Sequence, residues 1–263
     1  MGILNVTPDS FSDGGRHDAL NAAVTRARAM LDEGADIIDV GGESTRPGAQ
    51  TVPVEEELRR TVPVIQALRE AAADDDPTPL ISIDTRKPEV AEACVLAGAD
   101  IWNDVSALTY SERSLPLAAD LGCLVILMHA KGTPDTMQDR PRYDDPVEEV
   151  LAFLRTRLDA CEAAGVEREH VTIDPGIGFG KRLSDNLALL RATPRFVELA
   201  PTLIGTSRKS FIQKIDGSTV DKRLPGSLAS ALHALHGGAR VLRVHDVAET
   251  LQAVRVWEAI EHA

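Results

Sequence analysis

Several polar residues of this sequence each follow a short apolar run, a spacing that suits an active site. Carboxylate and amide side chains can bind a ring that carries N–H donors and carbonyl acceptors, whereas cationic side chains can hold anionic oxygens. A serine that opens a helix adds backbone N–H groups that favour a carboxylate. The residues in question are Asn5, Asp84, Asn103, Asp104, His129, Asp174, Lys209, Ser210, Arg243 and His245. Together they predict a site for a polar ring bound beside an anionic group.

Eight apolar runs precede these residues and alternate with amphipathic stretches. Several runs are apolar and β-branched at nearly every position, as strands buried on both faces should be. Strands are expected at 3–7, 36–41, 80–84, 101–105, 124–129, 171–175, 202–205 and 240–245. Helices are expected at 21–33, 54–73, 87–97, 115–121, 146–164, 184–199, 227–235 and 247–262. The pattern predicts an α/β fold, a single (β/α)8 TIM barrel that forms one domain over residues 1–263.

A doubly wound open sheet is the alternative arrangement of the same elements. It normally uses fewer strands, and no glycine fingerprint follows the first strand here. In a barrel, the strand ends and the loops after them meet on one rim, where catalytic groups lie. Taken alone, Asp84 or Asp104 is better explained as a helix cap or turn residue. Gathered on one rim, the polar residues indicate an active site.

One part of this rim is suited to phosphate. Asn5, Arg243 and His245 follow the first and eighth strands, which are neighbours in a closed barrel, and barrels often bind phosphate there. The amide oxygen of Asn5 can bind a hard divalent cation, which takes most of its other ligands from phosphate and water. A phosphate group held with a cation is therefore expected at this position.

The other side of the rim is suited to a heterocycle. Asp84, Asn103 and Asp174 follow the third, fourth and sixth strands and offer both hydrogen-bond acceptors and an amide donor. Lys209 lies between the two groups. Ser210 is expected to open the next helix, where it would favour a carboxylate.

Two polar loops stand out by their length and composition. Residues 9–15 and 43–53 contain glycine or proline together with one conspicuous side chain each, Phe11 and Arg46. They are either ordinary connections or loops that order over a substrate and exclude water.

Composition excludes several classes of function. The formal net charge of -13 disfavours a nucleic-acid partner, and no apolar run is long enough to span a membrane. Three unpatterned cysteines fit buried thiols in a reducing compartment, so a cytoplasmic protein is expected. The first strand ends without the His-x-His pair of a barrel metal hydrolase, and none of the cysteines has a base partner near it in the sequence.

The same segments carry a resemblance to a known family. Residues 2–15, 41–48, 83–85, 103–106, 174–181, 207–210 and 243–246 closely resemble bacterial dihydropteroate synthases, in order and over essentially the whole chain. The resemblance implies an enzyme that joins (7,8-dihydropterin-6-yl)methyl diphosphate to para-aminobenzoate. The products would be 7,8-dihydropteroate and diphosphate.

The resemblance also implies a role for each residue. The pterin diphosphate would be held by Asp84, Asn103, Met128, Asp174, Lys209, Arg243 and His245. The para-aminobenzoate site would contain Phe11, Thr45, Arg46, Pro47, Phe179 and Ser210. Mg2+ would bind Asn5, and the catalytic set would be Asp13, Lys209, Arg243 and His245. A homodimer formed through helices late in the chain and sensitivity to sulfonamides are implied as well.

The implied mechanism needs no nucleophilic side chain. Mg2+ and cationic residues would stabilise the departing diphosphate, and the amine would attack the cationic pterin methylene left behind. Asp13 could place negative charge near that cation. Two alternatives are a pterin-binding methyltransferase acting on methyltetrahydrofolate and an inactive paralogue that binds pterin without making product. The methyltransferase would not need the diphosphate pocket or Lys209 and Ser210, so the full residue set argues against it. The paralogue would be expected to lose loop residues first, and both loops have the family's residues. Relatives commonly carry an N-terminal hairpin before the first strand, and the site on the opposite rim is expected not to depend on it.

Overall fold

The computed structural model describes residues 1–6, 16–44, 49, 51–72, 77–132 and 141–263. These residues form β1 (Gly2–Asn5), β2 (Ile37–Gly41), β3 (Leu80–Asp84), β4 (Ile101–Asp104), β5 (Leu124–Met128), β6 (Val171–Asp174), β7 (Leu203–Ile204) and β8 (Val241–Leu242). The helices are α1 (Arg16–Asp32), α2 (Val54–Ala71), α3 (Pro88–Leu96), α4 (Ser114–Leu121), α5 (Pro146–Ala164), α6 (Leu183–Arg191), α7 (Thr193–Val197), α8 (Ser210–Asp216), α9 (Leu224–His236) and α10 (Val247–Glu261). Two short 3-10 helices, η2 (Arg168–His170) and η3 (Val220–Lys222), complete the set.

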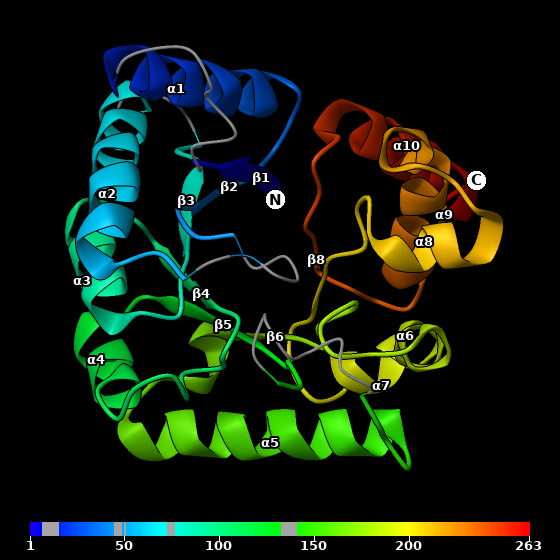
Figure 1. Ribbon diagram of the computed structural model, residues 1–263. Coiled ribbons are helices and arrows are strands. Elements are labelled where there is room, and N and C mark those ends of the chain that lie inside the picture. The colour runs from blue at the N-terminus through cyan, green and yellow to red at the C-terminus, as the bar shows by residue number, and fades with distance from the viewer. Residues whose placement is uncertain (7–15, 45–48, 50, 73–76, 133–140) are drawn as a thin grey trace.

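The strands close into a barrel. β1 to β6 pair in sequence order and in parallel, and β7 pairs with β8. Single bridges from Gly2 to Val244 and from Ile173 to Thr202 join the two sheets at both seams. The helices form a ring around the strands (Figure 1). The predicted (β/α)8 barrel is therefore confirmed, and the open sheet is excluded.

The barrel interior is divided into an apolar end and a polar end. Strand residues alternate between the inside of a barrel and its outer wall. Near the N-terminal ends of the strands, the inner side chains form one hydrophobic cluster made of Met1, Ile37, Ile101, Leu124, Ile126, Leu203 and Val241. Asp39, Ser82 and Asn103 come next, and their side chains contact one another. The carboxyl ends of the strands thus present polar groups above an apolar floor.

The outer wall of the barrel packs against the helices. Ile38, Val40 and Ile83 belong to a buried cluster with residues of α1 and α2, and Leu127 and Ile173 belong to a second cluster with α5 and α6.

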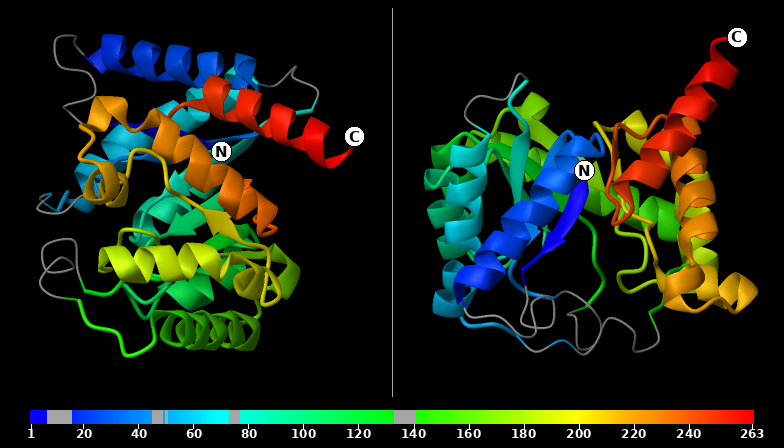
Figure 2. Two further views of the ribbon diagram at one scale, coloured as in Figure 1. Left: turned by 90° about the vertical axis from the view of Figure 1, so that its right-hand side faces the viewer. Right: turned by 90° about the horizontal axis from the view of Figure 1, so that it is seen from above.

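The three cysteines are free and buried, as expected. Figure 2 shows α10 extending beyond the other helices at the C-terminus. In the described part of the chain, each helix is too short or too polar to cross a membrane.

Some elements differ from the sequence prediction. The helix expected at 184–199 is two helices, because α6 ends at Arg191 and Pro194 lies in the first turn of α7. After β7 the chain forms α8 and η3 before α9. The sequence predicted a helix start at Ser210 but not the extent of α8, and it did not predict η3. β7 and β8 are only two residues long, so the predicted strand ends at 205 and 245 lie in loops.

The loops after β5 and β6 approach each other closely. Gly176 has a φ of +69°, and a Cβ at this position would lie 1.9 Å from the carbonyl oxygen of His129. A side chain is therefore excluded twice, by backbone conformation and by space. Its N–H donates to Asp174 Oδ1 over 2.7 Å, so the same glycine orients a predicted site residue.

We predict that Gly176→Ala lowers the free energy of unfolding by about 3 kcal/mol or more, because the clash adds to the left-handed strain. Gly122→Ala is the matched control, since Gly122 also has positive φ (62°) but a Cβ there would meet no atom within 4 Å. That variant should lose only about 1 kcal/mol. Urea unfolding measures both, and equal losses would contradict the argument from space.

Candidate active site

A half-buried arginine lies at the centre of the polar end of the barrel. The Nε atom of Arg243, just beyond β8, donates to Asp39 Oδ2 over 2.6 Å, and its Nη2 atom donates to Asp84 Oδ2, also over 2.6 Å. The three residues come from β8, β2 and β3. The sequence pattern grouped Arg243 with the phosphate-binding residues, and the resemblance implied that it also lies against the pterin. In the structure its guanidinium contacts the carboxylates on the ring-binding side.

Asp39 is the member of this group that the sequence analysis missed. Its side chain is fully buried and accepts from Ser82 Oγ over 2.6 Å and from Asn103 Nδ2 over 3.3 Å. It was overlooked because it lies in the middle of a strand instead of at its end. The available signal was an acid inside an otherwise apolar run, since a buried charge needs a partner.

Arg243, Asp39 and Asp84 bring one guanidinium together with two carboxyl groups, so their formal charges do not cancel. Burial raises the pKa of Asp84 to about 7, and the Arg243 guanidinium partly opposes that shift. Burial would lower the pKa of Arg243, but the carboxylates of Asp39 and Asp84 outweigh it and raise that pKa. Because two carboxylates share one guanidinium, the carboxylate of Asp84 is ready to accept either a proton or an N–H group of a ligand.

A second acid–base pair lies on the neighbouring side of the rim. Asp174 ends β6, and burial raises its pKa while Lys209 acts in the opposite direction. Burial lowers the pKa of Lys209 to about 8, opposed by Asp174. The Lys209 ammonium donates to the carbonyl oxygen of Ile177 and lies 4.5 Å from the ring centre of Phe179. Met128 is buried and directly opposite Asp174 in the β5–β6 register.

The remaining rim residues lie at the ends of β1, β7 and β8. Asn5 ends β1, is half-buried and pairs with Gly41 of β2. His245 Nδ1 is 3.0 Å from Ser207 Oγ. Ser210 is the first residue of α8, as the sequence predicted.

Two rim residues that could have belonged to the site are structural. Asp104 follows Asn103, so its side chain faces the outer wall, where its carboxylate accepts from the N–H groups of Ser106 and Leu108. His129 is 2.9 Å from the buried Lys181 ammonium, and burial lowers the pKa of the histidine to about 3. It is therefore neutral and serves as an acceptor for a lysine that ties the β5 and β6 loops together.

Five predicted site residues fall outside the described residues, so their placement is not part of this geometry. They are Phe11, Asp13, Thr45, Arg46 and Pro47. The described residues that border these segments are nevertheless anchored. The Lys87 ammonium contacts Glu43 and Glu57 and also the carbonyl oxygen of Val52, on both sides of residues 45–48.

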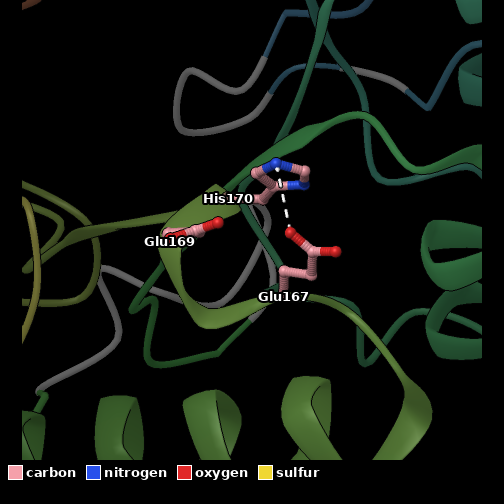
Figure 3. A group of neighbouring side chains, drawn as sticks. All are labelled: Glu167, Glu169 and His170. Carbon is pink, nitrogen blue, oxygen red and sulfur yellow. Dashed lines mark ion pairs between the residues drawn. The ribbon is translucent and has the colours of Figure 1, made fainter.

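Two features elsewhere on the surface contain none of the predicted residues. Glu167, Glu169 and His170 gather in and beside η2, just before β6 (Figure 3), with His170 Nε2 3.6 Å from Glu167 Oε2. A surface hollow of about 390 Å³ lies between the end of α1 and α10 and is lined by Glu33, Ala248, Leu251, Gln252, Arg255 and Val256. The candidate site is therefore the polar rim, not these surface features.

Comparison with known proteins shows which family this chain belongs to. Residues 1–245 match the family described as pterin binding enzyme. The chain is 49% identical over 260 residues to the dihydropteroate synthase of Escherichia coli (strain K12), with 98% of this chain and 90% of the relative covered. The chain belongs to the dihydropteroate synthase family. Its members are transferases, so the predicted enzyme class is confirmed.

Other members of the dihydropteroate synthase family show the same likeness. The Synechocystis enzyme is 47% identical over 99% of this chain and 89% of its own. The structure of the Xanthomonas albilineans dihydropteroate synthase with 4-aminobenzoic acid has a TM-score of 0.92 at 49% identity, covering 100% of this chain and 93% of that one. The Yersinia pestis enzyme in a sulfonamide drug complex has a TM-score of 0.90 at 43% identity, with the same coverage.

We predict that Asp84→Asn flattens the pH dependence of stability. The pKa of Asp84 is about 7 in the folded protein and about 3.9 in an unfolded chain, so the folded state holds an extra proton between these values. The resulting stabilisation is fully present below about pH 4 and is lost as the pH rises through 7. The wild type should therefore lose more unfolding free energy between pH 5 and pH 8 than Asp84→Asn does.

Urea unfolding at fixed ionic strength measures this difference. Asp159→Asn, at an exposed position on α5, is the control and should follow the wild-type curve. If the Asp84→Asn curve also ran parallel to the wild type, the assignment of the proton to Asp84 would be wrong.

Proposed function

We propose that this chain joins (7,8-dihydropterin-6-yl)methyl diphosphate to para-aminobenzoate, giving 7,8-dihydropteroate and diphosphate. The observation that supports this best is the unbalanced acid–base group of Asp39, Asp84 and Arg243 beside the Asp174–Lys209 pair. Its carboxylates suit the N–H donors of a pterin ring, and its cations suit an adjacent anionic group. Family membership supports the same reaction.

The described residues can divide the work of binding the pterin. The carboxylates of Asp84 and Asp174 would accept from ring N–H groups, and the Asn103 amide would complete the hydrogen bonds. Lys209 would donate to a ring acceptor, and the buried side chain of Met128 would pack against the ring face. Because Asp84, Asn103, Asp174 and Lys209 already have hydrogen-bond partners that hold them in place, little conformational freedom is lost on binding.

The diphosphate would lie toward β1 and β8. Asp39 and Asp84 bond to Nε and Nη2 of Arg243, so the diphosphate would contact Nη1, with His245 as a second donor. Asn5 fits Mg2+ because its amide oxygen is a hard, neutral donor on this rim, and Mg2+ takes few protein ligands when phosphate supplies the others. When bound, Mg2+ would neutralise charge on the leaving diphosphate.

The chemical step would depend on electrostatics instead of a nucleophilic side chain. Arg243, His245 and Lys209 would stabilise negative charge as the diphosphate leaves. Phe179 and Ser210 would bind the aminobenzoate, together with Phe11, Thr45, Arg46 and Pro47. Its neutral amine would then form a bond to the pterin methylene as the bond to the diphosphate oxygen breaks, and the new C–N group would lose one proton to solvent water. Asp13 would add negative charge near the cationic methylene.

We predict that the chain releases diphosphate from the pterin diphosphate only with Mg2+, and that dihydropteroate forms in step when para-aminobenzoate is present. Lys209→Met should lower turnover about 100-fold or more, as expected when a group that stabilises the transition state is lost. Lys222→Met, at an exposed position in η3, is the matched control and should retain wild-type turnover. Pterin binding with no release would favour the inactive paralogue. Methyl transfer from methyltetrahydrofolate would favour the methyltransferase.

The proposal includes a homodimer formed through helices late in the chain. Exposed apolar side chains on this part of the chain support it, namely Ile215, Val220, Val256 and Ile260. We expect sedimentation equilibrium to give twice the chain mass, and Val256→Asp with Ile260→Asp to shift the mass toward the monomer. A monomeric wild type at micromolar concentration would contradict this part of the proposal.

A further inference from the structure

Arg208 has a backbone conformation that side chains rarely adopt. Its φ is 57°, and it occupies the third position of a turn that the Lys209 N–H closes onto the Thr206 carbonyl oxygen over 3.2 Å. Turns with positive φ at this position normally place glycine there. The turn alone therefore does not explain why this position holds an arginine.

The strained backbone is fixed from both sides. The Arg208 N–H donates to Ser227 Oγ over 2.8 Å, and the Arg208 carbonyl oxygen accepts from Arg223 Nη1 over 2.9 Å. Ser227 and Arg223 are both buried, at the start of α9. Such conformations persist where the surroundings hold them in place, and they cluster at functional sites.

The side chain of Arg208 reaches across to the loop after β8. Its Nε donates to Asp246 Oδ2 over 2.9 Å, and its Nη2 donates to Asp246 Oδ1, so the pair is bidentate. One residue earlier on each loop, Ser207 Oγ accepts from the His245 N–H over 3.2 Å and contacts His245 Nδ1 over 3.0 Å. Residues 207 and 208 are thus joined to residues 245 and 246 at two successive points.

We propose that Arg208 is a positioning residue, whose bond to Asp246 fixes the loop after β7 against the loop after β8 and thereby orients Lys209 and His245. It would not be a ligand of the diphosphate, although it is a cation on the rim. A glycine would fit the turn with less strain, but only a long side chain with two parallel N–H donors can make this connection. The inference rests on the proposed function, because Lys209 and His245 are assigned there.

The test compares four proteins: the wild type, Arg208→Gly, Asp246→Asn and the double variant Arg208→Asp with Asp246→Arg. The double variant restores an ion pair with its charges exchanged, and aspartate tolerates positive φ better than most residues. We expect Arg208→Gly and Asp246→Asn to keep wild-type melting temperatures within a few degrees and to lower kcat about tenfold. KM for para-aminobenzoate should change little, and the double variant should recover to within about threefold of wild-type kcat.

Direct binding of the diphosphate by Arg208 predicts a different result. Arg208→Gly would then raise KM for the pterin diphosphate, and the double variant would be no better than the single variants. Failure of the double variant to recover, or unchanged kcat in Arg208→Gly, would overturn the proposal. Arg113→Gly removes another exposed ion pair, with Glu89, and is the control that should leave kcat unchanged.

The proposed function and this inference can fail separately. Turnover by the wild type tests the proposed function before any variant is compared. If the wild type has no turnover, binding of inorganic diphosphate to the same four proteins, measured by calorimetry, tests the second. Weaker binding in both single variants with recovery in the double variant would support the Arg208–Asp246 connection, and equal binding in all four would refute it.

Discussion

The guanidinium of Arg243, shared by the buried carboxylate of Asp39 and the half-buried carboxylate of Asp84, is the interaction on which the rest of the structure depends. Asp39 and Asp84 lie 204 and 159 residues away from it in the sequence. Each of the three charges would be costly to bury without the others, so the interaction is complete only when β8 meets β2 and β3 inside a closed barrel. Closure of the fold and assembly of the site are therefore one event.

The strand pattern explains why much of the site could be predicted. Side chains alternate along a strand, and the apolar runs located the strand ends closely enough to identify Asp84, Asn103 and Asp174. The same alternation explains where the prediction was incomplete. Asp104 was grouped with the rim although its side chain faces outward. Asp39 was not predicted because only residues at strand ends were considered as candidates, and Asp39 lies inside β2.

Other features were beyond sequence reasoning because they depend on contacts between distant segments. The partner of Lys181 is a histidine 52 residues earlier, and nothing in either segment indicates the other. The break between α6 and α7 had a local signal in Pro194, but the insertion of α8 and η3 between β7 and α9 had only the serine at its start. The positive φ of Arg208 had no local signal, since the residues that hold it are Arg223, Ser227 and Asp246.

The two lysines near Asp174 differ in their access to chemical probes. Lys181 is only 1% exposed, so its amine is closed to reagents. Lys209 is half-buried on the rim, and burial lowers the pKa of its amine to about 8, so more of this amine is neutral near pH 7 than that of an ordinary lysine. A neutral amine is a nucleophile. A pterin-like scaffold bearing a mild electrophile could therefore form a covalent bond with Lys209 and leave Lys181 unmodified, which would make this rim a starting point for irreversible inhibitors.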